Sequence, residues 1–197
     1  GYMDAARKKA EYNIGQLAPL AKKGYPLLTC CTSCGLMLKQ EYLELYNLDG
    51  AKIVADHHYD ASEFLLELLD SGQLPTFQKD TREQYLYHAP CHLRAQGIGL
   101  PGLELLREAA GLDIVEIDAG CCGIAGSYGF KKEKYELSLS IGEKLFQAIA
   151  RYSSATVITE CGTCQLQIEQ VVGVKTVHPV SLLCGGDGFT IMRGKLD

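Results

Sequence analysis

The sequence lacks the long apolar segments that a membrane-spanning helix requires. Its apolar runs are short and interrupted, as in residues 64–69, where Glu67 breaks the run, whereas a helix that crosses a bilayer needs about 18 to 20 consecutive apolar residues. Lysine and arginine number 19 against 24 aspartate and glutamate residues, so that the net charge is −5. Since nucleic-acid-binding domains carry a basic surface, we expect no nucleic-acid partner.

Motifs that bind nucleotide phosphates are absent as well. Glycine occupies positions 120, 123, 126 and 129, but this segment contains neither the G-x-G-x-x-G motif nor a P-loop. We therefore do not expect the glycine-rich segment to bind a phosphate group.

Cysteine is the residue type that the sequence has in excess. Nine cysteines stand at positions 30, 31, 34, 91, 121, 122, 161, 164 and 184. A disulfide framework is typical of small secreted proteins. This chain is long, its cysteine count is odd, and no segment in it has the basic, apolar and small-residue order of a secretory signal. We therefore favour thiolates that bind metal in a cytoplasmic protein.

Strand-like and helix-like segments alternate along the chain. Helices are expected at 4–23, 36–46, 60–70, 103–110, 131–152 and 165–172. Strands are expected at 26–29, 51–56, 83–88, 114–118, 156–159 and 175–177, with a loop at 71–82 as the boundary between two parts. This alternation predicts an α/β fold with a largely parallel sheet.

The chain also contains an internal repeat. Two Cys-x-x-Cys motifs begin at Cys31 and Cys161, which are 130 positions apart, and each follows a strand-like segment and precedes a helical one. We predict duplicated βα units in pseudo-two-fold halves, with an incomplete first cysteine-rich repeat at 1–78 and a complete second repeat at 79–197. Because the first repeat lacks an adjacent-cysteine loop, we expect the sequence to be the C-terminal part of a longer protein.

The adjacent cysteines Cys121 and Cys122 lie within the glycine-rich segment. Neighbouring Cα atoms are about 3.8 Å apart, and in an extended chain their side chains would point to opposite faces. Both sulfurs can serve one site only if the backbone curls around it. Glycine permits such a curl, because it tolerates positive φ values and a close approach of the main chain.

Cys91, Cys121-Cys122-Gly123 and the motif from Cys161 to Cys164 together resemble the signature of the cysteine-rich CCG domain family. Members occur in heterodisulfide reductase, in iron–sulfur subunits of glycolate and lactate oxidation, and in one of the subunits of anaerobic glycerol-3-phosphate dehydrogenase. The flanking segments are most similar to the last group; these are residues 87–92, 121–133 and 178–183. The ferredoxin-like cysteine runs of such subunits are missing here.

The resemblance implies an iron–sulfur electron-transfer subunit that is not catalytic when alone. In the heterodisulfide reductase relatives, five cysteines hold a non-cubane [4Fe–4S] cluster; the equivalent cofactor-binding residues here are Cys91, Cys121, Cys122, Cys161 and Cys164, together with Gly123. The implied partners are a flavin-containing dehydrogenase subunit and a membrane-bound or quinone-linked acceptor. A peripheral position at the inner face of the cell membrane would follow.

The residues themselves leave other interpretations open. A cubane [4Fe–4S] cluster or a structural zinc ion takes four thiolates, so that a fifth cysteine would be bridging, spare or reactive. Zinc at this site is therefore one alternative. Thiol–disulfide redox catalysis at the cluster, which the resemblance to heterodisulfide reductase implies as a second possibility, is the other. We expect Cys31 and Cys34 to form an incomplete first site, with Cys30 as a spare thiol. We expect Cys184 to be buried as a small apolar residue. His92 and His178 are candidates for positions around the cluster, with a purely structural role as the default for His178.

Overall fold

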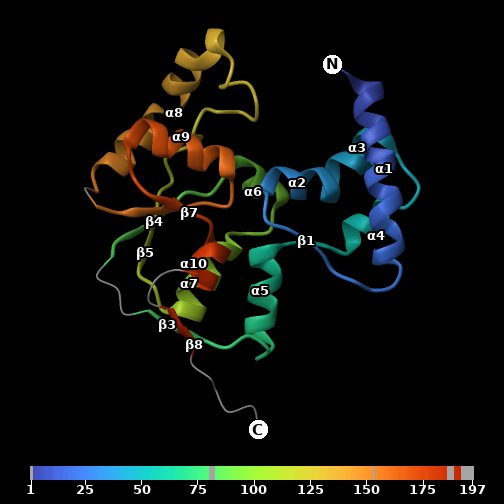
Figure 1. Ribbon diagram of the computed structural model, residues 1–197, viewed down its shortest axis with the longest axis horizontal. Helices are drawn as coiled ribbons and strands as arrows, with labels where there is room; N and C mark the ends of the chain where they lie inside the picture. Colours follow the sequence, from blue (N-terminus) through green and yellow to red (C-terminus); the bar gives the residue numbers. More distant parts are fainter. Residues whose placement is uncertain (1, 80–82, 153, 186–188, 192–197) are drawn as a thin grey trace.

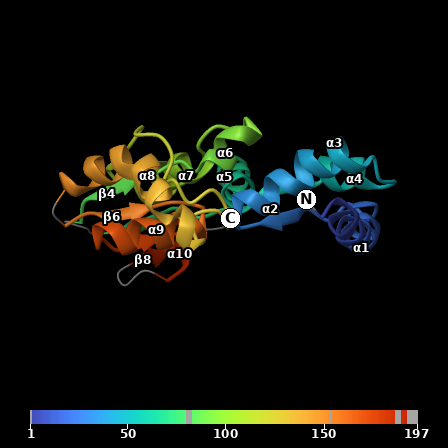
Figure 2. The same ribbon diagram turned by 90° about the horizontal axis from the view of Figure 1, so that it is seen from above.

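The computed structural model describes residues 2–79, 83–152, 154–185 and 189–191, with the backbone alone at 77–79, 184, 185 and 189–191. Figure 1 shows a larger part built on a parallel sheet and a smaller, helical part that carries the N-terminus. Seen from above in Figure 2, the molecule is elongated, with α1, α3 and α4 at one end and α2 leading towards the sheet.

The larger part is built on a four-stranded sheet in the order β5-β4-β6-β7, with all strands parallel. The strands are β4 (Tyr85–Tyr87), β5 (Ile114–Glu116), β6 (Thr156–Ile158) and β7 (Thr176–Val177). The helices are α6 (Cys91–Gln96), α7 (Pro101–Ala110), α8 (Tyr135–Ala150), α9 (Gly162–Val172) and α10 (Pro179–Gly185), and a 3-10 turn, Lys132–Lys134, precedes α8.

Helices cover both faces of this sheet. Successive side chains of a strand point to opposite faces, so that each strand contributes side chains to two apolar cores. In β4, Tyr85 and Tyr87 join the apolar core beneath α7 and α10, whereas Leu86 joins the core beneath α8 and α9. In β6, Ile158 and Val157 divide in the same way. Figure 1 shows the two helix pairs on opposite sides of the strands, as is typical of parallel sheets.

The smaller part contains a two-stranded parallel pair, β1 (Leu27–Thr29) and β2 (His58–Asp60). Its helices are α1 (Met3–Ala21), α2 (Thr32–Leu36), a π-helical turn (Met37–Glu41), α3 (Tyr42–Tyr46), α4 (Ala51–Asp56) and α5 (Ala61–Asp70). At 19 residues α1 is long, but neither it nor another helix in the described ranges is long and apolar enough to cross a membrane.

The strand expected at 51–56 is wrong, because this segment forms helix α4. Ala51 and Val54 are three positions apart and fully buried, and both join the core with Ile14 of α1. This spacing places them on one face of a helix. A short apolar run does not by itself distinguish a strand from a buried helix, and here the contact with α1 decides.

The prediction of a mixed α/β fold with parallel strands is confirmed, but the strands do not form one sheet. The expected loop at 71–82 contains β3 (Phe77–Lys79), which pairs with β8 (Phe189–Ile191) in an antiparallel ladder. The helix expected from residue 36 begins at Thr32. Helix α6 was not expected.

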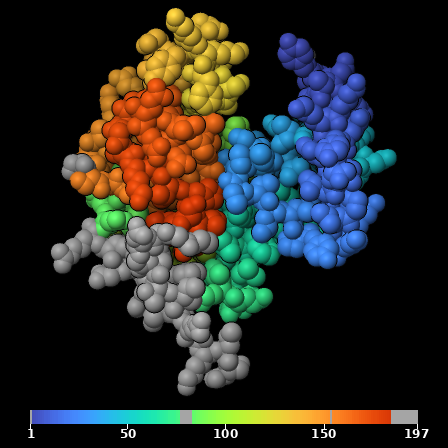
Figure 3. Space-filling model, viewed as in Figure 1, coloured from blue at the N-terminus to red at the C-terminus, as the bar shows by residue number. Residues whose placement is uncertain are grey.

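Contacts between α2 and α6 join the two parts. Gln96 Nε2 donates a hydrogen bond to the carbonyl oxygen of Thr32 (3.2 Å), and the Ser33 hydroxyl is hydrogen-bonded to His92 Nδ1 (2.9 Å). Helix α5 packs along α7. Above α2, the surface is hollowed between α1 and the lobe at the start of α8 (Figure 3).

Candidate functional site

Three parallel strands lead the candidate ligands to one edge of the sheet. β4 leads to Cys91 at the start of α6, β5 leads to the segment with Cys121 and Cys122, and β6 leads to Cys161 at the N-terminus of α9. Parallel strands present their carboxyl ends at the same edge, which is where open α/β sheets bind their ligands. The strand order therefore places these segments side by side.

The five sulfurs form one continuous set of contacts. The Sγ atoms of Cys122 and Cys164 lie 3.1 Å apart. Electrostatic interactions further link Cys91 with Cys121, Cys121 with Cys122, and Cys161 with Cys164. Cys122, Cys161 and Cys164 are buried, Cys121 is half-buried and Cys91 is exposed. The structure thus brings together all five cysteines that the motif singles out.

Hydrogen bonds within this set control which sulfurs are charged. Cys121 accepts hydrogen bonds from Cys122, Cys91 and the backbone N–H of Gly123 (3.3 Å), and together they lower the pKa of its thiol to about 2. Hydrogen bonds from Cys164, first of all, and from Thr163 lower the pKa of Cys161 to about 5. These two sulfurs are therefore thiolates at neutral pH, the form that binds metals.

The other three sulfurs keep their protons. The pKa of Cys91 is raised, first by its hydrogen bond with Cys121 and then by burial. The pKa of Cys122 is raised to about 11, mainly by its hydrogen bond with Cys121, and that of Cys164 is raised mainly by its hydrogen bond with Cys122. Binding a metal through all five sulfurs would therefore release protons.

The glycines at every third position serve two different purposes. Gly120 and Gly126 have φ values of +86° and +64° with open space around them, so that only the backbone conformation calls for glycine. Gly123 and Gly129 lie against Ser138 of α8. A Cβ atom would come within 2.0 Å of the Ser138 carbonyl oxygen at Gly123 and within 2.5 Å of Ser138 Oγ at Gly129. The segment therefore curls around Ser138. A curled backbone at this point was expected from the two adjacent cysteines.

Helix α8 approaches the adjacent cysteines closely at Gly142. A Cβ atom there would lie 2.5 Å from the carbonyl oxygen of Cys122. Neither Ser138 nor Gly142 was anticipated as a contact of the site. Helical spacing places both on the buried face of α8, but a sequence pattern does not show which loop covers that face.

A buried carboxyl group next to Cys161 was also missed. Glu160 is fully buried, and its Oε1 accepts a hydrogen bond from the Tyr87 hydroxyl (2.5 Å). Burial raises the pKa of Glu160 to about 8, so that the group is mostly neutral at pH 7. Gly102, at the start of α7, leaves the space that this carboxyl fills, because a Cβ atom there would lie 2.1 Å from Oε1.

Three histidines lie near the ends of strands of the four-stranded sheet. His92 is hydrogen-bonded to Ser33, and His178 Nδ1 accepts a hydrogen bond from the backbone N–H of Val180 (3.1 Å). His88 interacts electrostatically with the sulfur of Cys121. Burial lowers the pKa of His88 to about 4, so that this side chain is uncharged at neutral pH.

The cysteines of the proposed first repeat form a separate, more exposed group. Cys30 and Cys34 are exposed and Cys31 is half-buried. Cys31 and Cys34 are hydrogen-bonded to each other, and the pKa of Cys34 is raised, mainly by burial and then by Cys31. Within the described residues, the interactions that link the five sulfurs include none of these three cysteines, although α2 packs against α6, which begins at Cys91. The Cys184 side chain lies outside the described residues, so that its expected burial stays a prediction.

The five sulfurs are not spaced to bind a metal directly. Two thiolates on one tetrahedral zinc ion lie about 3.8 Å apart, given Zn–S distances of about 2.3 Å, whereas Cys122 and Cys164 are at 3.1 Å, so that these two sulfurs must move apart before both can bind a metal ion or a cluster. Within the described ranges, no group of three or more histidine, cysteine or acidic side chains is arranged to hold one metal ion. The chemistry of the side chains fits an iron–sulfur cluster, because such clusters are held by cysteine sulfurs.

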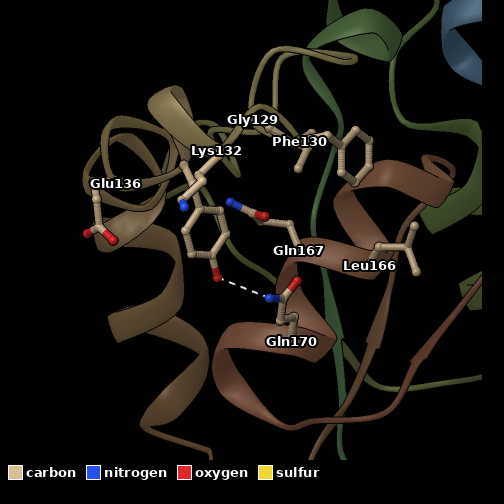
Figure 4. Close-up of a pocket in the computed structure, with 9 residues that line it drawn as sticks. Gly129, Phe130, Lys132, Glu136, Leu166, Gln167 and Gln170 are labelled. Atoms are coloured by element: carbon tan, nitrogen blue, oxygen red, sulfur yellow. Dashed lines mark hydrogen bonds between the residues drawn. The ribbon is translucent and has the colours of Figure 1, made fainter.

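A surface pocket of about 510 Å³ lies behind the cysteine segment rather than at the sulfurs. Ile124 and Gln167, which line it, follow Cys122 and Cys164 closely in the chain. Figure 4 shows Phe130 above Leu166 on one side and Lys132 and Glu136 on the other. Gln170 Nε2 donates a hydrogen bond to the Tyr135 hydroxyl (3.0 Å) across the pocket.

These features define a cysteine-rich class of domain. Residues 85–169 match the family described as the cysteine-rich CCG domain. The matched segment includes β4, all five converging cysteines and most of α9. The part of the chain that holds the five sulfurs thus belongs to the CCG cysteine-rich domain family, and the resemblance seen in the sequence is confirmed.

Similarity to individual proteins extends over most of the chain. It is 40% identical over 185 residues to the anaerobic glycerol-3-phosphate dehydrogenase subunit designated C in Escherichia coli (strain K12), covering 93% of this chain and 46% of that subunit. It is 35% identical over 153 residues to the fumarate reductase (CoM/CoB) subunit designated B in Methanothermobacter marburgensis, covering 76% of this chain and 29% of that subunit.

A further relative is an uncharacterized iron–sulfur protein of Methanocaldococcus jannaschii, 29% identical over 143 residues, which are 72% of this chain and 26% of that protein. The chain is thus homologous to one of the subunits of anaerobic glycerol-3-phosphate dehydrogenase. It spans less than half the length of each of these three relatives.

Proposed function

We propose that the chain is an iron–sulfur electron-transfer domain of a multi-subunit dehydrogenase. The observation that carries this proposal is the contact of five cysteine sulfurs, from three segments, at the carboxyl edge of a parallel sheet. Similarity to a dehydrogenase subunit and to an iron–sulfur protein supports it.

Cys91, Cys121, Cys122, Cys161 and Cys164 would hold the cluster, which we propose to be of the non-cubane [4Fe–4S] type because five thiols exceed the need of a cubane. When bound, the cluster supplies one-electron transfer. The chain supplies two ready thiolates, Cys121 and Cys161, and the burial of three sulfurs excludes water from most of the site. The N–H of Gly123 donates to Cys121 and stabilises negative charge there.

Electrons would come from a flavin-containing dehydrogenase subunit of the glycerol-3-phosphate type and pass to a quinone-linked partner at the cytoplasmic face of the membrane. The similarity to a glycerol-3-phosphate dehydrogenase subunit supports such an assembly. In this arrangement the domain is a relay and performs no chemistry on an organic substrate by itself.

We also propose that the chain consists of two related units, an incomplete one at 1–78 and a complete one at 79–197. The order α1–β1–α2, with β2 parallel to β1, resembles the order α8–β6–α9, with β7 parallel to β6. In each unit a Cys-x-x-Cys motif follows the first strand and begins the next helix. Cys31 and Cys34 would then be the remnant of a first site.

The test is purification under strict anaerobiosis, followed by iron, sulfide and zinc analysis and EPR spectroscopy. We expect about four iron and four sulfide per chain, as the proposed cluster type requires. Reduction should give an EPR signal that is lost on oxidation or on exposure to air. Stoichiometric zinc without iron would refute the cluster and leave a structural zinc module.

One observation favours thiol–disulfide redox catalysis as a second candidate function. Cys91 is exposed and is hydrogen-bonded to Cys121, whose pKa is lowered, so that a thiolate lies next to an accessible sulfur. Turnover of a low-molecular-weight disulfide by the isolated, cluster-loaded chain would favour this function. A relay without catalysis should show none.

A further inference from the structure

A buried serine connects the two segments that carry Cys122 and Cys164. Ser138 of α8 is fully buried, and its hydroxyl donates a hydrogen bond to the carbonyl oxygen of Gly123 (2.9 Å). The same hydroxyl accepts a hydrogen bond from Nε2 of Gln167 (2.9 Å). Gly123 follows Cys122 directly, and Gln167 lies one helical turn after Cys164. These hydrogen bonds therefore join the same two segments that the contact between the Cys122 and Cys164 sulfurs joins.

The direction of these hydrogen bonds follows from a count of donors. A serine hydroxyl has one proton to donate, whereas a carbonyl oxygen only accepts. Gly123 offers Ser138 a carbonyl oxygen, so that the hydroxyl proton must point there. The amide of Gln167 must then turn its nitrogen, not its oxygen, towards Ser138. Gln167 extends from α9 into the pocket next to this connection (Figure 4).

The bond from Ser138 fixes the conformation of Gly123. Gly123 has a φ value of +87°, and its N–H donates to the sulfur of Cys121 (3.3 Å). Glycine has more backbone freedom than any other residue, so that this N–H would not keep its direction without a restraint. Ser138 restrains Gly123 through the hydrogen bond to its carbonyl oxygen, and the backbone of Ser138 also lies close to Gly123.

We propose that Ser138 and Gln167 are positioning residues that set the reduction potential of the cluster by holding the Gly123 N–H on the Cys121 sulfur. This rests on the proposed iron–sulfur function. Reduction adds negative charge to a cluster, and N–H groups aimed at its sulfur ligands stabilise that charge and raise the potential. Loss of the restraint should therefore lower the potential.

Three variants test the connection. Ser138→Ala removes the donor to Gly123 and the acceptor for Gln167. Gln167→Met keeps a side chain of similar length and leaves the bond from Ser138 to Gly123, so that it should have a smaller effect in the same direction. Ser140→Ala is the matched control, because Ser140 lies on the same helix but is exposed.

The first readout needs no cluster. In metal-free protein under reducing conditions, exchange of the Gly123 amide hydrogen, followed by NMR, should be about tenfold faster in Ser138→Ala, as expected for the loss of one buried hydrogen bond. Ser140→Ala should stay within about twofold of the parent. Equal exchange in the parent and in Ser138→Ala would overturn the proposal.

The second readout is the midpoint potential of the anaerobically loaded protein, obtained by EPR-monitored redox titration. The expected order, from lowest to highest, is Ser138→Ala, then Gln167→Met, then Ser140→Ala together with the parent. An unchanged potential in a less stable Ser138→Ala variant would assign Ser138 a structural role only and overturn the proposal. If Ser138→Ala does not fold, a potential in Gln167→Met equal to that of the parent overturns it instead.

The outcomes separate this inference from the proposed function. Normal iron and sulfide contents with an unchanged potential would refute the positioning role and leave the iron–sulfur function intact. Absence of iron and sulfide from the parent protein would refute the proposed function. The amide-exchange experiment would then still decide whether Ser138 holds Gly123.

Discussion

The sulfur of Cys122 lies 3.1 Å from the sulfur of Cys164, although 42 positions separate the two residues in the chain. One belongs to the glycine-rich segment after β5 and the other to the first turn of α9. Both are buried, so that their thiols bond to each other and not to water. A metal at this site must displace their protons and separate the two sulfurs.

Replacement of Cys164 by serine should strongly reduce metal binding at the five-sulfur site. The hydroxyl is a much poorer iron ligand than a thiolate because it loses its proton less readily, and loss of a ligand should reduce the iron content at least about tenfold, since changes around a metal's ligands alone cost 10- to 100-fold in affinity. Iron and sulfide analysis after anaerobic purification measures this. Cys30→Ser, at an exposed cysteine outside the set, is the control, and an equal loss in both variants would contradict the assignment.

Substitution of Gly123 by alanine should destabilise the fold far more than substitution of Gly126. Both residues have positive φ values, but a Cβ atom at Gly123 would lie 2.0 Å from the Ser138 carbonyl oxygen, whereas Gly126 faces open space. We expect a loss of about 1 kcal/mol for Gly126→Ala from backbone strain, and about 3 kcal/mol or more for Gly123→Ala from strain and overlap together. Urea unfolding of the metal-free protein measures both; equal losses would contradict the close contact.

Replacement of Glu160 by glutamine should change how stability depends on pH. Burial raises the pKa of Glu160 to about 8 in the folded state, from 4.5. Between these values the folded protein keeps a proton that the unfolded chain has released, so that this group's contribution to stability falls as pH rises. Glutamine does not titrate.

The stability of Glu160→Gln relative to the parent should therefore increase from pH 5 to pH 8, by at most about 1.4 kcal/mol per pH unit. Urea unfolding at several pH values gives this difference. Glu108→Gln, which removes an exposed carboxylate from α7, is the control. The same pH trend in both variants would show that the buried position of Glu160 is not its cause.

Alkylation should distinguish the two groups of cysteines in the reduced, metal-free protein. Cys30 is exposed, whereas Cys122 and Cys164 are buried. With iodoacetamide and peptide mass spectrometry, we expect Cys30 to be modified at least about tenfold faster than Cys164, because access of the reagent limits the buried thiols. In urea the difference should disappear. Rapid modification of Cys164 in the native protein would contradict its burial.

The sequence by itself determined the class of fold and singled out the proposed ligands. The spacing of Cys91, the Cys121–Cys122 pair and the motif at Cys161 singles out the five cysteines that the structure brings together. The alternation of strand-like and helix-like segments also located the four strands of the parallel sheet, because this signal depends on residues close together in the chain.

Only the tertiary structure decided the rest. Residues 51–56 form a helix because Ala51 and Val54 pack on α1, and no local pattern reveals that partner. Glu160 is mostly neutral at pH 7 because other elements of the fold bury it.

The glycine-rich segment shows the same division. Its glycines predict a curled backbone. The structure shows why Gly123 and Gly129 cannot be larger: both lie against Ser138, a residue of the helix that follows the segment. Whether a serine on a helix is buried against a loop depends on packing between distant segments. The sequence therefore singles out the five cysteines, and the fold decides what surrounds them.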